Sequence, residues 1–214
     1  MYRIGYIDDE PTQYTNFAKK IKRRYLDMEL VLLEGCTTKS EFIEKIYEVQ
    51  ADTLLIDYKM VRAYGFNGTT LISYINDQIK DLECFILTQV DTEQIDDGLV
   101  ALRNRFSKTV FDTEADDPEK LKELDAFIGI LKDSAQVFRK RREQKVGRYK
   151  ELLEKRKRDE LGADEEEFLN LYKVLSSYGM VEKLPDNLIS SGFEQKLDNL
   201  LKIGNEIIED KTNK

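Results

Sequence analysis

The first half of the chain alternates between two kinds of apolar pattern, and this alternation limits the folds open to it. Short apolar runs typical of buried β-strands occupy residues 2–7, 28–35, 52–57, 83–88 and 108–113. Between them, apolar residues recur at helical spacing after Pro11 and over residues 41–49, 69–79 and 91–106. Strands that alternate with helices predict a parallel sheet covered by helices on both faces. We therefore expect a five-stranded, doubly wound α/β domain, with a capping box from Thr38 and Glu41 at the start of its second helix.

Carboxylates and a hydroxyl stand where three of the expected strands end. Asp8 and Asp9 follow the first strand, Asp57 closes the third, and Thr88 closes the fourth. Ligands of such sheets bind outside the carboxyl ends of the strands, so we expect these side chains at one edge. Converging carboxylates repel one another unless a positive charge lies among them. Mg²⁺, which prefers oxygen ligands, is the usual solution. The sequence therefore predicts a Mg²⁺ site suited to phosphoryl chemistry on one of the acids.

The composition excludes several classes of protein. The chain has no histidine, which removes histidine bases, Ser-His-Asp triads and histidine metal ligands. Its formal net charge of -8 argues against a general nucleic-acid binder. No apolar run approaches the roughly 18 residues of a membrane span, and no secretory signal is visible. We predict a cytoplasmic protein without membrane contact, in which Cys36 and Cys84 are free thiols.

From residue 117 onwards the pattern is entirely helical. A 3-4 spacing of apolar residues predicts a long helix over residues 117–160 with a coiled-coil seam: Leu121, Leu124, Ile128, Leu131, Ala135 and Phe138. Whether this stripe packs on its own domain or on a second chain is open, and the helix length favours a homodimer. Two shorter helices are expected near residues 164–177 and 193–209. The expected organisation is a domain over 1–132, the long helix over 117–160, and a helical C-terminal region over 163–214.

The long helix carries a basic run. Residues 132–158 contain 12 Lys and Arg against 4 Asp and Glu. One interpretation is a solvated helix supported by pairs such as Glu151 with Lys155. The other is a contact with nucleic-acid phosphates, which needs charge and no sequence code. We find no helix-turn-helix or zinc-finger pattern, so nucleic-acid binding is possible but not favoured.

The strand-end motifs resemble those of a known family. "IDDE" after the first strand, "LLIDYKM" after the third and "FILT" in the fourth occur in the order and spacing of receiver domains of bacterial two-component response regulators, over residues 1–132. The resemblance implies a flavodoxin-like fold and phosphorylation of Asp57. It also implies Mg²⁺ held by Asp8, Asp9, Asp57 and the backbone carbonyl of Lys59. Thr88 would then donate its hydroxyl to the phosphoryl oxygens.

The resemblance also implies a lysine at the end of the fifth strand, and here the match is looser. Lys108 follows Thr88 at about the right interval, but it begins the expected strand 108–113 and would stand at the wrong end of it. The aromatic switch residue is either Phe106 or Phe111. The loop after Asp57 is about three residues longer than is usual in the family.

These features predict a response regulator, not an enzyme. A sensor histidine kinase or phosphotransfer protein, or a small acyl phosphate, would phosphorylate Asp57. The output would be homodimerisation through the long helix or engagement of another protein. The alternatives are a DNA-binding regulator that uses the basic helix, or a degenerate receiver that acts as a scaffold. A phosphatase-type hydrolase is disfavoured, because "LIDYKM" lacks a second acid two residues after the first.

Overall fold

The structure is a computed structural model that describes residues 1–95, 98–113 and 117–181 of the 214 in the chain. The chain divides into two compact units, residues 1–144 and residues 145–214. No helix of the described residues is long and apolar enough to cross a membrane.

The first unit is built on a five-stranded parallel sheet. Its strands are β1 (Tyr2–Ile7), β2 (Met28–Leu32), β3 (Thr53–Ile56), β4 (Cys84–Thr88) and β5 (Arg105–Ser107). Their order is β2-β1-β3-β4-β5, and every neighbouring pair is parallel. This is the flavodoxin-like, doubly wound order. The fold class predicted from the sequence is therefore confirmed.

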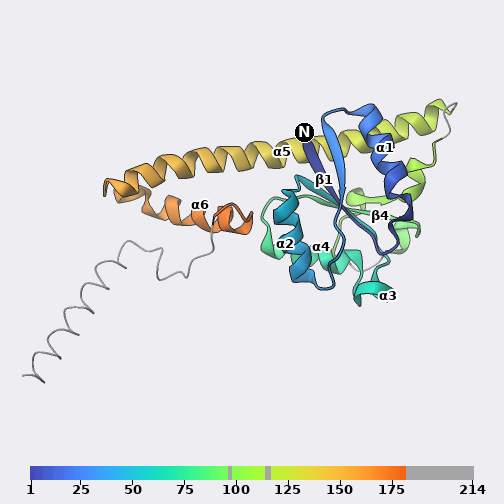
Figure 1. The fold of residues 1–214 in the computed structure, drawn as a ribbon, viewed down its shortest axis with the longest axis horizontal. Helices are drawn as coiled ribbons and strands as arrows, with labels where there is room; N and C mark the ends of the chain where they lie inside the picture. The colour runs from blue at the N-terminus through green and yellow to red at the C-terminus, as the bar shows by residue number, and fades with distance from the viewer. Residues whose placement is uncertain (96–97, 114–116, 182–214) are drawn as a thin grey trace, which may run out of the picture. The chain divides into compact units, whose positions relative to one another are not determined.

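Helices cover both faces of the sheet (Figure 1). Helix α1 (Tyr14–Arg24) and the first part of α5 (Pro118–Lys157) lie on one face, and α2 (Lys39–Val49) and α4 (Gly68–Gln78) lie on the other. Because side chains alternate along a strand, Ile4 and Tyr6 of β1 enter the core shared with α1 and α5. The predicted capping box of Thr38 and Glu41 is present at the start of α2.

The connection between β4 and β5 differs from the prediction. Residues 91–106 were expected to form a helix, but the described part contains two 3-10 turns, Thr92–Gln94 and Leu102–Asn104, and residues 96–97 lie outside it. A helix would have placed Ile95, Leu99 and Leu102 on one inward face, but only Ile95 of these three is buried, and Leu99 and Leu102 are exposed. The guanidinium of Arg105 donates to the carbonyls of Thr92 and Val100. These bonds hold the loop against the sheet.

The fifth strand also begins earlier than predicted. It spans Arg105–Ser107, and Lys108–Phe111 forms a 3-10 turn in place of the strand expected over 108–113. The Ser107 hydroxyl accepts from the backbone N–H of Thr109 and caps this turn. Phe111 is turned into the core, where its ring stacks on Phe17 at 4.1 Å between centroids. Lys108 therefore follows β5 directly and stands at its carboxyl end.

The predicted long helix is confirmed as α5, and its apolar stripe packs within the first unit. Five members of the stripe are buried: Leu124, Ile128, Leu131, Ala135 and Phe138. Leu124, Ile128 and Leu131 belong to the same core cluster as β1 and α1. This part of the stripe is therefore occupied by the chain's own sheet.

The second unit contains the end of α5 and helix α6 (Glu165–Ser177), joined through a 3-10 turn at Gly162–Asp164. The rings of Tyr149 and Phe168 stack at 5.2 Å, and Leu152, Phe168 and Leu175 are buried. The helix predicted near residues 164–177 is confirmed as α6. The helix predicted near 193–209 lies outside the described residues.

Candidate functional site

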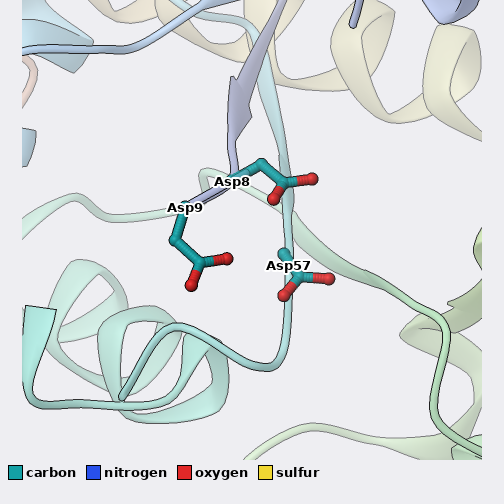
Figure 2. A group of neighbouring side chains, drawn as sticks. All are labelled: Asp8, Asp9 and Asp57. Carbon is teal, nitrogen blue, oxygen red and sulfur yellow. The ribbon is translucent and has the colours of Figure 1, made fainter. Parts of the chain in front are cut away.

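The strand register brings two of the predicted acids side by side. Strands β1 and β3 pair with Ile7 opposite Ile56, so the next residues, Asp8 and Asp57, leave the sheet at the same level. Asp9 follows on the loop, and Figure 2 shows the three carboxylates around one space. One carboxylate oxygen from each lies within 4.8 Å of the others. The edge predicted from the sequence thus gathers three negative groups.

Lys108 lies between two of these acids. Its Nζ is 2.7 Å from Oδ2 of Asp8 and 2.9 Å from Oδ1 of Asp57. The lysine side chain is 13% exposed, and the two carboxylates are 2% and 6% exposed. Charges so far from water interact strongly and need a partner. Lys108 supplies the positive charge that converging acids require.

Backbone and side-chain donors orient the same acids. The N–H of Glu10 donates to Oδ1 of Asp8 at 2.9 Å, and the phenol of Tyr6 donates to Oδ2 of Asp8. The N–H of Lys59 donates to Oδ2 of Asp57 at 2.8 Å. Each carboxylate is therefore held from two sides.

Burial and charge shift the acid–base properties of the site. Burial raises the pKa of Asp57, although the hydrogen bond and charge of Lys108 oppose this. Burial and then the charge of Asp8 raise the pKa of Asp9. Burial lowers the pKa of Lys108, but Asp8 and Asp57 outweigh it and leave that pKa raised. Burial, followed by the hydrogen bond to Asp8, raises the pKa of the Tyr6 phenol, so this group is a neutral donor.

The donor set fits Mg²⁺. With ligands at roughly 2.0–2.1 Å in an octahedron, ligand oxygens are separated by about 3 or about 4 Å. One oxygen each of Asp8, Asp9 and Asp57 lies within 4.8 Å of the others, so the three acids are close enough together to share one cation once Lys108 shifts from between Asp8 and Asp57. All are hard carboxylate donors, as this cation prefers.

Thr88, the remaining predicted side chain of the site, lies at the same edge. Thr88 ends β4, is 1% exposed, and pairs with Ser107, the residue before Lys108. Its hydroxyl accepts from the backbone N–H of Val90 at 3.2 Å. The loop after Asp57 includes a short helix, α3 (Val61–Tyr64), which accounts for its extra length. Of the two candidate aromatic residues, Phe106 is partly exposed in β5 and Phe111 is buried.

Sequence reasoning missed two residues that contact this site. Tyr6 lies two positions before Asp8, and residues two apart share a face of a strand. The sequence did contain a clue to this contact, because a tyrosine stands in a predicted buried strand two residues before an acid of the site. Gly68 begins α4 against the backbone of Asp57, where an added Cβ would lie 2.0 Å from the Asp57 carbonyl oxygen. Only this close approach, which depends on tertiary packing, identifies it.

The basic run on α5 is largely paired with acids of the same unit. In the first unit, Arg139 and Arg142 bind the fully buried Asp52, and Lys132 binds Asp27 at 2.9 Å. In the second unit, Arg148 pairs with Glu167. A lysine or arginine that is already paired with a carboxylate attracts a phosphate group less strongly. These contacts favour a helix supported by ion pairs over a contact with nucleic-acid phosphates, although Lys155 binds Asp164 and not the predicted Glu151.

Comparisons with known proteins return receiver domains. No protein-family model and no curated protein matches the chain. The response regulator TrrA of Thermotoga maritima, solved with Mg²⁺ and BeF, matches at 20% identity and a TM-score of 0.40, over 60% of this chain and 99% of its own. A chain from the complex of TrrA with the histidine kinase ThkA matches at 19% identity and a TM-score of 0.42, over 60% and 98%.

A CheY-like receiver domain protein of Methanospirillum hungatei JF-1 matches at 17% identity and a TM-score of 0.43, over 66% of this chain and 98% of its own. Each of these three similar structures contains a response regulator or a receiver domain.

Proposed function

We propose that this chain is a response regulator that accepts a phosphoryl group on Asp57. The observation that carries the proposal is the position of Lys108, whose Nζ bonds to both Asp8 and Asp57 at the carboxyl edge of the sheet. An acid pair neutralised by a lysine, with a third acid beside it, is an arrangement suited to in-line phosphoryl transfer. In such transfers positioning and charge neutralisation do most of the chemistry.

The proposed reaction is a single displacement at phosphorus. A carboxylate oxygen of Asp57 attacks the phosphoryl group of a phosphohistidine on a sensor kinase or phosphotransfer protein, or of a small acyl phosphate. A bond from oxygen to phosphorus forms, and the bond from phosphorus to the donor nitrogen or oxygen breaks. The donor leaves with the electron pair, and Asp57 becomes an acyl phosphate. No further enzymatic reaction is proposed.

Asp8, Asp9 and Asp57 would hold Mg²⁺, with the carbonyl of Lys59 as a further ligand. When bound, the cation supplies positive charge to the phosphoryl oxygens and to the acids around them. The chain's own residues do the rest. The N–H of Lys59 fixes the orientation of the Asp57 carboxylate. Lys108 would exchange a carboxylate partner for a phosphoryl oxygen, and Thr88 would donate its hydroxyl to another.

The proposed output is a protein–protein contact through the helical C-terminal unit. Phosphorylation replaces the single negative charge of the Asp57 carboxylate with a phosphoryl group of roughly -1.5 to -2 units, which brings three strong acceptor oxygens to the sheet edge. Helix α5 packs its buried stripe on that sheet and continues to Lys157, so it offers a covalent route from the site. Because the stripe is occupied, homodimerisation would use surfaces of the helices beyond it.

The test is phosphorylation in vitro with a matched variant. Wild type and Asp57→Asn are incubated with Mg²⁺ and acetyl phosphate, then examined by intact mass spectrometry and light-scattering chromatography. We expect one phosphoryl group on wild type only, with a change in solution mass. Absence of an adduct, together with no binding of beryllofluoride, would contradict the proposal and favour a degenerate receiver that acts as a scaffold.

A further inference from the structure

Tyr6 is a buried phenol directed at the acidic site. It lies in β1 and is 0% exposed. Its ring stacks on Tyr14 at 6.2 Å and meets the edge of Phe17 at 6.1 Å. Its hydroxyl donates to Oδ2 of Asp8. A buried hydroxyl needs a hydrogen-bond partner, and the partner of the Tyr6 hydroxyl is Asp8, one of the proposed metal ligands.

The contacts of Asp8 leave little room for a cation. A carboxylate has about four acceptor positions. Oδ2 accepts from both Tyr6 and Lys108, and Oδ1 accepts from the N–H of Glu10 at 2.9 Å. Asp8 can therefore bind a cation in one of two ways. It can use the free acceptor position on Oδ1, or the position on Oδ2 that Lys108 would vacate.

The three donors differ in their freedom to move. The N–H of Glu10 belongs to the backbone, and the Tyr6 ring is fixed by packing between Tyr14 and Phe17. Lys108 has a long, flexible side chain and a second partner in Asp57. When Lys108 shifts, Tyr6 and the Glu10 N–H still hold the Asp8 carboxylate. Without the Tyr6 hydroxyl, the Glu10 N–H would be the one fixed donor left of these three, and a single hydrogen bond restrains the broad terminal torsion of Asp8 less than two do.

We infer that Tyr6 is a positioning residue for Asp8, holding its carboxylate in the orientation that presents an oxygen to a divalent cation shared with Asp9 and Asp57. This inference rests on the proposed function, because it assigns a role in the cation site of that function. A phenylalanine would fill the same core volume without a hydroxyl, so packing alone does not require a tyrosine here.

The experiment compares two tyrosines of one aromatic cluster. Tyr6→Phe removes the hydroxyl on Asp8, and Tyr14→Phe removes a hydroxyl that donates to the carbonyl of Leu30 at 3.0 Å. Mg²⁺ binding to the full chain is measured by titration calorimetry, and folding is checked by thermal unfolding. We expect Tyr6→Phe to weaken Mg²⁺ binding about 10-fold, the usual cost of losing a partner of a metal ligand. Tyr14→Phe should bind as wild type does.

A second measurement uses wild type alone, so it does not depend on folding of the variant. With ¹³C at the tyrosine Cζ atoms, Mg²⁺ should move the Tyr6 signal and leave the Tyr14 signal in place. Equal Mg²⁺ affinity of the two variants, tighter binding by Tyr6→Phe, or a Tyr6 signal that does not move would each overturn the inference and leave the proposed function standing. A wild type that binds no Mg²⁺ would instead contradict the cation site of the proposed function, and the role of Tyr6 with it.

Discussion

Gly68 touches the backbone of Asp57 so closely that a Cβ at position 68 would lie 2.0 Å from the Asp57 carbonyl oxygen. The N–H of Gly68 also donates to the carbonyl of Tyr58 at 2.9 Å. The start of α4 therefore determines the course of the loop that follows the proposed phosphorylation site. No side chain can be accommodated there without a backbone shift.

We therefore predict that Gly68→Ala destabilises the first unit by about 1–3 kcal/mol, as overpacking does, and slows phosphorylation of Asp57. Gly129→Ala is the matched control. Gly129 lies in α5, where an added Cβ would meet only the Tyr25 hydroxyl at 3.9 Å. Alanine there should stabilise the helix by about 0.5–1 kcal/mol. Denaturant unfolding of both variants checks this, and equal effects would refute the role of the close approach.

Removing the lysine of the site should expose the repulsion between its acids. Lys108→Met leaves Asp8 and Asp57 buried without their shared counter-charge, and breaking a buried pair in this way costs about 3–5 kcal/mol. Because Mg²⁺ would replace the lost charge, it should stabilise the variant more than wild type in thermal unfolding. Lys122→Met, at an exposed position of α5, is the control. A Lys108→Met protein as stable as wild type without Mg²⁺ would show that the acids do not need the lysine.

Neutralising Asp57 should stabilise the metal-free protein at neutral pH. Its folded pKa is raised above the ordinary value, chiefly by burial. A group of this kind favours the folded state at low pH, and that contribution is lost as the pH rises through the folded pKa. At pH 7 the ionised Asp57 therefore opposes folding, and Asp57→Asn removes the penalty. The gain should shrink on acidification and be absent below about pH 3.9, the unfolded value.

This pH dependence is measured by urea unfolding in the presence of a chelator. Asp77→Asn, at an exposed position of α4, should unfold as wild type does at every pH. Added Mg²⁺ should stabilise wild type and have less effect on Asp57→Asn, since a ligand stabilises only the state that binds it. An Asp57→Asn protein that is less stable than wild type at pH 7 without Mg²⁺ would contradict the prediction.

At the amino-terminal end of the parallel strands, Asp52 binds two arginines of α5 within the first unit. Asp52 is 0% exposed and binds Arg142 at 3.0 Å and Arg139. Asp52→Ala should cost about 3–5 kcal/mol, because it leaves two cations without their buried partner. Asp27→Ala removes the exposed pair with Lys132 and should cost at most about 1 kcal/mol. Equal losses of stability in the two variants would show that burial of the pair is unimportant.

A substitution that destabilises the second unit should leave the stability and phosphorylation of the first unit unchanged. Leu152 is 0% exposed in the core formed by the end of α5 and α6. Leu152→Ala should destabilise that core by about 2–5 kcal/mol, with faster hydrogen exchange over residues 145–181. Phosphorylation of Asp57 should be unchanged, and any change in solution mass on phosphorylation should be lost. Lys150→Ala, at an exposed position, is the control for the same helix. Slower phosphorylation of Leu152→Ala would indicate that the first unit depends on the second.

The amino-acid sequence by itself determined the sheet and most of the helices that cover it. Alternating apolar patterns predicted the elements up to β4, and the acids at strand ends predicted the edge where Asp8, Asp9 and Asp57 meet. These predictions succeed because a buried parallel strand needs a continuous apolar run, and the carboxyl ends of parallel strands necessarily share an edge.

The tertiary structure alone decided the elements whose local pattern is ambiguous. Residues 108–111 have strand-like composition, but Phe111 is better buried against Phe17 in a turn, and β5 forms over the preceding residues. Because the strand lies three residues earlier than predicted, Lys108 stands at its carboxyl end, where it binds Asp8 and Asp57. In the same way, the stripe on α5 could have faced a second chain, and only the apolar face of the chain's own sheet decides its partner. Contacts between residues far apart in the chain, such as Phe17 stacked on Phe111 or Lys108 bonded to Asp8, carry no signal in local periodicity.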